Sequence, residues 1–130
     1  MLNRVLPRYS EHAYALLRIV AGLMFAQHGA QKLFGALGGK TVELVSQRGL
    51  GGVIELTGGL LIAVGLATRW AAFLASGTMA VAYFQFHWKF HTGEQLFPVV
   101  NRGELAVMYC FFFLYVACRG AGIWSVDRRN

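Results

Sequence analysis

The feature of this chain that most constrains its fold is the length of its apolar stretches and the places where polar residues interrupt them. Four stretches, over residues 13–34, 50–67, 70–90 and 104–118, reach or approach the roughly 17–25 residues of a membrane-spanning helix. Only 14% of the residues are charged, whereas soluble proteins carry about 25%. The sequence therefore predicts an all-α integral membrane protein, a four-helix bundle in up-down-up-down order.

These stretches occupy most of the chain, so residues 1–130 are expected to form a single transmembrane domain. The first dozen residues are mixed polar, and no small-residue cleavage pattern follows the first apolar stretch. We therefore expect a retained membrane anchor rather than a signal peptide. The longest connection follows the first helix, where Val42 and Val45 are three residues apart. This spacing predicts a short interfacial helix over residues 41–47.

The basic residues indicate an orientation. An even number of spans places both termini on one side, together with the connection between the second and third helices. The arginines expected on that side are Arg4, Arg8, Arg69, Arg119, Arg128 and Arg129. The other side carries fewer basic residues in its loops, which predicts cytoplasmic termini. We expect the net charge of +6 to meet lipid phosphate at helix ends, and we expect no nucleic-acid partner.

Polar residues gather where the first and third stretches end and where the second and fourth begin. In up-down-up-down order these four positions share one side of the membrane. Ionisable side chains are costly in hydrocarbon and usually face a bundle interior or a wet cavity. The sequence therefore predicts one polar site in the outer leaflet. The candidates for ligand binding or proton handling are His28, Gln31, Lys32, Glu55, His87, Asn101 and Glu104.

Glu55 is surrounded by small residues on its own helical face. The glycines three and four positions away are Gly51, Gly52, Gly58 and Gly59. Glycine on a membrane helix lets a second helix approach closely. We therefore expect Glu55 to be buried and to contact the first helix through His28 or Lys32. A polar bridge that serves packing alone is an alternative of equal weight.

Three other patterns have simple structural interpretations beside functional ones. His87 and His91 are four residues apart and would need a third ligand to bind a metal, so the aromatic and basic segment around them favours interfacial anchoring. No metal site is expected, although these two histidines remain candidates. Asn101 and Glu104 have the spacing of a helix capping box. Arg18 lies in the opposite leaflet, where it can reach the surface or bond to backbone carbonyls.

Four segments, taken together and in order, resemble the DoxX family of small four-helix bacterial membrane proteins. They are LLRIVAGLMFAQHGAQKLFG (residues 16–35), GVIELTGGLLIAVGLATRWAAF (52–73), NRGELAVMY (101–109) and GIWSVDR (122–128). The matching polar positions are Arg18, His28, Gln31, Lys32, Glu55, His87, Asn101 and Glu104. The resemblance implies a multi-pass protein of the bacterial inner membrane. It also implies redox work, since members are associated with terminal quinol oxidase and thiosulfate:quinone oxidoreductase systems.

The resemblance implies a redox-associated subunit whose polar site binds a quinone head or another small ligand, with His28 and Glu55 handling protons. The chain shows no flavin or dinucleotide motif, so electron transfer would require redox protein partners or another cofactor. Whether the chain is itself an enzyme, and whether it forms an oligomer in the bilayer, stays open. Two alternatives remain: a carrier of a small polar solute, and a non-catalytic membrane scaffold.

Overall fold

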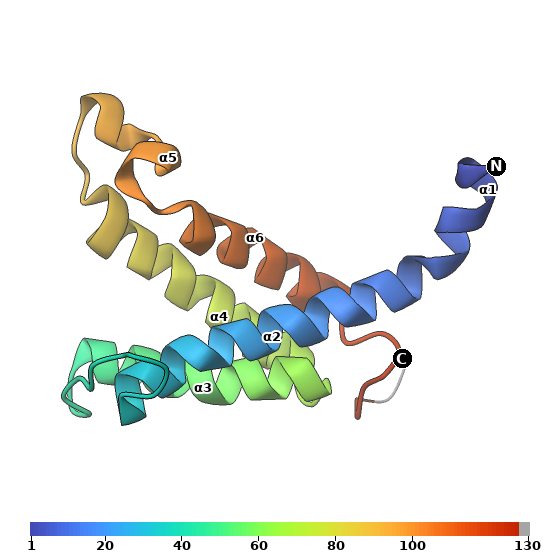
Figure 1. Cartoon of the computed structure of the whole chain (residues 1–130), viewed down its shortest axis with the longest axis horizontal. Helices are drawn as coiled ribbons and strands as arrows, with labels where there is room; N and C mark the ends of the chain where they lie inside the picture. The colour runs from blue at the N-terminus through green and yellow to red at the C-terminus, as the bar shows by residue number, and fades with distance from the viewer. Residues whose placement is uncertain (128–130) are drawn as a thin grey trace.

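The computed structural model of this protein describes residues 1–127, and within them every regular element is helical. The four long helices are α2 (Ser10–Phe34), α3 (Gln47–Val64), α4 (Thr68–Ala82) and α6 (Glu104–Arg119). Consecutive long helices run in opposite directions (Figure 1). The predicted all-α class is confirmed, and the direction of the helices alternates in the expected order.

Short elements lead into the long helices and connect them. They are α1 (Leu2–Val5), the 3₁₀ helix η1 (Leu6–Tyr9), the π-helix η2 (Tyr83–Trp88), the 3₁₀ helix η3 (Gly93–Leu96) and α5 (Pro98–Asn101). In residues 1–127 no helix has both the length and the apolar character required for crossing a membrane. Arg128 and Arg129, which contribute to the predicted orientation, lie outside the described residues.

The long helices pack mainly as two pairs, α2 with α3 and α4 with α6. Glycines make the contact between α2 and α3 close. A Cβ atom added to Gly59 would lie 2.5 Å from the Gly22 carbonyl oxygen, and one added to Gly22 would lie 2.6 Å from the Gly59 oxygen. About two turns further along α2, a Cβ added to Gly29 would lie 2.5 Å from the Gly52 carbonyl oxygen of α3. The two backbones therefore touch, as small-residue helix contacts allow.

The expectation that four glycines around Glu55 clear space for a neighbouring helix is only half right. Gly52 and Gly59 face α2, as described above. A Cβ on Gly51 would meet no atom within 4 Å, and one on Gly58 would meet only the Ala71 oxygen, at 4.0 Å. Positions three and four residues apart span a broad arc of the helix, and only one edge of that arc faces α2.

Aromatic side chains join the two helix pairs. The fully buried ring of Phe25 on α2 lies 4.9 Å from the ring of Phe113 and 5.4 Å from the ring of Tyr109, both on α6. Within the second pair, the Ser76 hydroxyl of α4 donates a hydrogen bond to the Cys110 carbonyl of α6 at 2.7 Å. Such aromatic contacts add to the burial of apolar area, so this cluster holds the pairs together near the middle of the molecule.

One end of the molecule is closed by Arg18, which is fully buried. Its guanidinium donates to the carbonyls of Ile62 at 3.2 Å and Ala63 at 3.4 Å, near the C-terminus of α3. It also donates to the carbonyls of Ile123 at 3.2 Å and Trp124 at 2.7 Å. The first two bonds reach carbonyls in the last turn of α3, and the other two hold the segment after α6 against that helix end. The predicted bonding of Arg18 to backbone carbonyls is confirmed.

The segment after α6 is held at the same closed end by Asp127. Its carboxylate accepts hydrogen bonds from the backbone N–H groups of Ala67 and Thr68, both at 2.8 Å. Asp127 thus satisfies donors at the start of α4, where a negative charge is also favoured by the helix dipole. Within the same helix pair, Arg69 of α4 donates to the Ala117 carbonyl at 2.9 Å near the end of α6.

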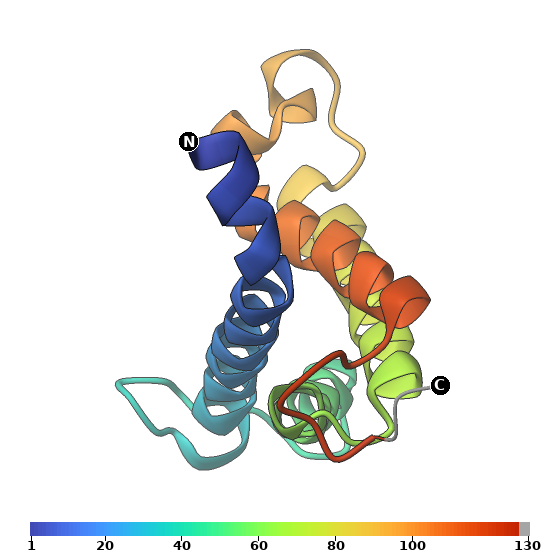
Figure 2. The ribbon, with the colours of Figure 1, turned by 90° about the vertical axis from the view of Figure 1, so that its right-hand side faces the viewer.

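At the opposite end the helix pairs diverge, so that the loop between α2 and α3 lies well apart from α5 (Figure 1, Figure 2). The predicted interfacial helix in that loop is wrong: residues 41–46 are irregular, and α3 begins at Gln47. The Ser46 hydroxyl accepts a hydrogen bond from the Gly49 N–H at 3.0 Å and caps α3. Gly49 packs directly against the Glu43 and Leu44 carbonyls. With Ser46 as its N-cap, α3 begins directly after residues 41–46, and these residues do not form a helix of their own.

Candidate functional site

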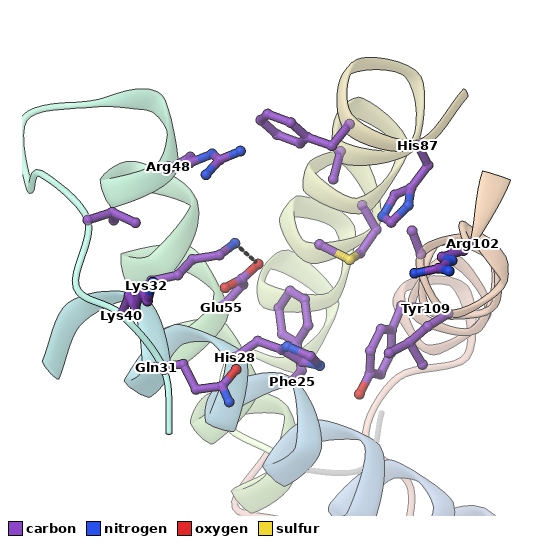
Figure 3. A pocket seen from close by; sticks show the side chains of 17 residues that line it. Phe25, His28, Gln31, Lys32, Lys40, Arg48, Glu55, His87, Arg102 and Tyr109 are labelled. Atoms are coloured by element: carbon purple, nitrogen blue, oxygen red, sulfur yellow. Dashed lines mark hydrogen bonds and ion pairs between the residues drawn. The ribbon is translucent and has the colours of Figure 1, made fainter. Parts of the chain in front are cut away.

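A cavity of about 480 Å³ lies between the two helix pairs at the end where they diverge (Figure 3). Its walls come from the end of α2, the start of α3, the end of α4 with η2, and the start of α6. The volume is within the range of roughly 300–1,000 Å³ that small-molecule sites occupy. The structure thus brings together the four helix ends that the sequence places on one side.

An ion pair lies on the wall formed by α2 and α3 (Figure 3). The Lys32 ammonium donates to Glu55 Oε1 at 2.7 Å, with the Glu55 side chain 4% exposed and the Lys32 side chain 34% exposed. The close backbone contact at Gly52, whose Cβ would lie 3.1 Å from Lys32 Cβ, sets the distance between the two helices here. The predicted burial of Glu55 and its contact with Lys32 are confirmed.

Two polar atoms in the cavity wall are buried and have no hydrogen-bond partner among residues 1–127. They are Glu55 Oε2, the second oxygen of the paired carboxylate, and the hydroxyl of Tyr109 on α6. A buried polar atom without a partner costs about 1–3 kcal/mol, so each one needs an explanation, such as a catalytic role or a bound water or ion. One atom accepts hydrogen bonds and the other both donates and accepts them.

The lining of the cavity is strongly basic. Lys32, Lys40, Arg48 and Arg102 face a single carboxylate, that of Glu55, which leaves a formal charge of +3 with histidines neutral. Arg102 lies on the wall opposite the ion pair, whereas Lys40 and Arg48 lie on the same side as Lys32, so positive charge faces the space from two sides (Figure 3). Such a concentration of one sign of charge attracts a group that is negative or becomes negative.

Two histidines reach the cavity from different walls (Figure 3). His28 on α2 is half-buried, and its ring lies edge-on to Tyr109 with centroids 6.4 Å apart. His87 in η2 is also half-buried and stacks against Tyr83 at 6.5 Å. A neutral imidazole has one donor and one acceptor nitrogen. The two side chains therefore add hydrogen-bonding groups of both kinds to the site.

The other predicted residues differ in their positions. Gln31 lines the cavity, but its amide already donates to the Leu37 carbonyl at 3.2 Å and holds the loop after α2. Asn101 is buried outside the lining. Its amide nitrogen donates to the Tyr83 hydroxyl at 3.1 Å and the Gln95 carbonyl at 2.9 Å, while its oxygen accepts from the N–H of Gly103. Asn101 is thus fully used in shaping the turn before α6.

The predicted capping box is wrong. Helix α6 begins at Glu104, with Gly103 as its N-cap residue and no side-chain cap bond. Arg102 has a left-handed backbone, with φ of 60°, which interrupts the helix that a box starting at Asn101 would need. Glu104 is exposed and lies outside the cavity lining.

The pairing of His87 and His91 on one helical face is also wrong. The helix ends at Trp88, and Lys89 and Phe90 follow with left-handed φ values of 55° and 57°. His91 is therefore exposed and outside the cavity lining. Across residues 1–127, His, Cys, Asp and Glu side chains do not form any group of three or more that could hold a metal ion.

Several lining residues are absent from the set expected from the sequence. Tyr109 is the most important, because it lies within an apolar helix and resembles an ordinary core residue. Its signal is its spacing: Leu105, Ala106 and Tyr109 line the cavity together, and residues three and four apart share a helix face. Lys40, Arg48 and Arg102 come from loops and a helix start at this end of the molecule, and all three line the cavity although each is exposed.

Comparison with known proteins agrees with this architecture. Residues 13–88, more than half of the chain, match the family model DoxX. A protein of Haemophilus influenzae that carries the description "Uncharacterized protein" is 39% identical over 128 residues, which cover 95% of each chain. No solved structure matches the chain. The resemblance read from the sequence is confirmed: this chain belongs to the DoxX family, a family of small membrane proteins.

Proposed function

We propose that this chain is an integral protein of the bacterial inner membrane whose cavity binds the head of a quinone, or a closely related small ligand, in the service of a membrane redox system. The observation that carries the proposal is the pair of buried, unpartnered atoms, Glu55 Oε2 and the Tyr109 hydroxyl, in one basic cavity. A quinone carbonyl accepts hydrogen bonds and a quinol hydroxyl donates them, so one head satisfies both atoms in turn.

The residues of the cavity fit each requirement of such a head. A bound quinone would supply reversible uptake of electrons and protons. Tyr109 and His28 are placed to donate hydrogen bonds to its oxygens, and Glu55 Oε2 is placed to accept one. The Lys32 ammonium pairs with Glu55 Oε1 at 2.7 Å and so fixes the position of the carboxylate. The basic lining favours negative charge on the head as electrons arrive.

The outer faces of the long helices support the membrane setting that family membership implies. Large apolar side chains are exposed on all four long helices, and they include Leu16, Leu23, Leu50, Leu60, Phe73, Leu74, Met108 and Phe111. So many exposed large apolar side chains on every long helix favour a surface that lipid or a partner covers. We propose a single four-helix membrane domain with cytoplasmic termini, so that the cavity opens towards the periplasmic face.

The closed end of the molecule favours head-group binding over passage of a solute. Beyond the cavity, the space between the pairs is filled by the fully buried side chains of Phe25, Phe113, Ile62 and Val116. Arg18 then seals the end through four bonds to backbone carbonyls. A scaffold without a ligand gives no role to the two unpartnered atoms that share the cavity wall, Glu55 Oε2 and the Tyr109 hydroxyl.

The test is equilibrium binding of a short-chain quinone to the purified protein. His28→Ala and Glu55→Ala should each weaken binding by about tenfold or more, because each removes a hydrogen bond in a buried site. Glu104→Ala is the matched control, since it removes an exposed carboxylate outside the cavity. The proposal is contradicted if the wild type shows no detectable binding, or if both cavity variants bind the quinone with the same affinity as the wild type. The carrier and scaffold alternatives would then remain.

A further inference from the structure

A second hollow of about 350 Å³ lies between α3 and α4 on the side of the molecule. Its outer part is apolar and is lined by Leu50, Ile54, Phe73, Leu74 and Val81. Three of these, Leu50, Phe73 and Leu74, are more than half exposed at 60%, 63% and 54%. We call this hollow the α3–α4 groove. It opens among side chains that would face hydrocarbon in a bilayer.

The α3–α4 groove and the polar cavity meet at the ion pair. The residues that line both spaces are Lys32, Arg48, Glu55, Met79, Ala82 and Phe86. The groove therefore runs from an apolar mouth on the helix surface to a charged inner end at Lys32 and Glu55. A polar head beside these two side chains would have its attached chain directed along the groove. Because the cavity and the groove are continuous, they fit one amphipathic ligand with a polar head and an apolar tail better than they fit two separate ligands.

Small residues keep the groove open. A Cβ atom on Gly51 or on Gly77 would meet no atom within 4 Å, so neither glycine is required by a helix contact. Glycine inside a helix costs up to about 1 kcal/mol relative to alanine, and at these two positions no close packing accounts for it. The hydroxyl of Thr78, which also lines the groove, donates to the Leu74 carbonyl of its own helix at 2.8 Å.

We infer that the ligand is a lipid: its head occupies the polar cavity, and its single isoprenoid or alkyl tail leaves sideways through the α3–α4 groove into the bilayer. This inference rests on the proposed function and narrows it, because a water-soluble solute has no use for the groove. Entry is then lateral, from the hydrocarbon layer, and the ligand never has to leave the membrane. Gly51 and Gly77 define the width of the path.

The experiment uses the full chain in lipid bilayer discs with a benzoquinone that carries one alkyl tail and a photoreactive diazirine on that tail. After illumination, peptide mass spectrometry should find the label on α3 and α4 at the groove. Gly77→Leu and Gly51→Leu should lower this labelling by about tenfold, since a leucine there fills the path instead of displacing a helix. Leu60→Phe adds apolar bulk on α3 outside the groove and should leave the labelling unchanged.

A tailless benzoquinone separates failure of this inference from failure of the proposed function. We expect the wild type and both glycine variants to bind the tailless head with equal affinity. If the tailless head binds but the label spreads evenly over the outer faces of α2 and α6, or is unaffected by both glycine variants, the tail path is refuted and the head site stands. If neither the tailless nor the tailed quinone binds, the proposed function fails and the inference fails with it.

Discussion

Glu55 shows how one side chain can serve packing and chemistry together. Its Oε1 atom is committed to Lys32, whereas Oε2 is buried beside the cavity without a partner. Burying one charge alone is costly, and pairing removes much of that cost. The ion pair therefore lets the protein keep a carboxylate at depth with one oxygen still free to bind. A role in helix packing alone explains why Oε1 is paired with Lys32, but it does not explain why Oε2 is buried without a partner.

Asp127 gives a residue-scale prediction for acid stability. Partial burial acts to raise the pKa of this carboxyl, but hydrogen bonds from Thr68 and Ala67 outweigh it and hold the pKa below its usual value. The unfolded chain then binds the proton more readily than the folded one, so stability from Asp127 is present above its ordinary pKa near 4 and is lost as pH falls through the lowered value.

Thermal unfolding in detergent over a pH series checks this prediction. At neutral pH, Asp127→Asn should lower the free energy of unfolding by about 1 kcal/mol, the usual worth of a helix cap. The gap between the wild type and the variant should shrink as the pH falls below about 4, because the unfolded chain then binds the proton, and it should close once the pH passes the lowered pKa of the folded carboxyl. A gap that stays constant or widens in acid would show that the charge of Asp127 does not stabilise the start of α4.

At the scale of helices, close backbone contact between α2 and α3 makes a sharp prediction. Gly59→Ala should destabilise the protein by about 1–3 kcal/mol, because its Cβ would lie 2.5 Å from the Gly22 oxygen and the helices must separate. Gly51→Ala, on the same helix, should be neutral or stabilising by up to about 1 kcal/mol, since its Cβ meets open space. Equal melting temperatures for the two variants would refute the glycine contact.

How far the sequence predicts the elements depends on what decides each one. Long apolar runs predict the four long helices and the shared position of His28, Lys32, Glu55 and His87, because burial alone requires that arrangement. The errors fall at helix ends. The left-handed backbone at Arg102, for example, occurs without glycine, so it depends on tertiary contacts rather than on local residue preference. The capping box and the histidine pair both failed for this reason.

The whole molecule combines a sealed end with an open one. Arg18, Arg69 and Asp127 use their hydrogen bonds on helix termini at the sealed end. The open end instead keeps buried polar groups in an unpartnered state at Glu55 and Tyr109. Natural folds usually satisfy such groups, and among residues 1–127 the sealed end also leaves two buried atoms without a partner, Arg18 Nε and Thr68 Oγ1. The diverging end differs in that both of its unpartnered atoms belong to residues lining one cavity with a basic lining, and this is the central reason to assign ligand binding there.

The most direct test of quinone binding in the cavity compares the wild type with Tyr109→Phe. The affinity of each purified protein for a short-chain quinone is measured together with its melting temperature. The change removes only a buried hydroxyl that lacks a protein partner. We predict that the fold is kept or slightly stabilised, while the dissociation constant rises by about tenfold through loss of one hydrogen bond to the head. An unchanged dissociation constant in a stabilised variant would show that the hydroxyl faces no ligand, and would contradict the assignment of the cavity as a quinone site.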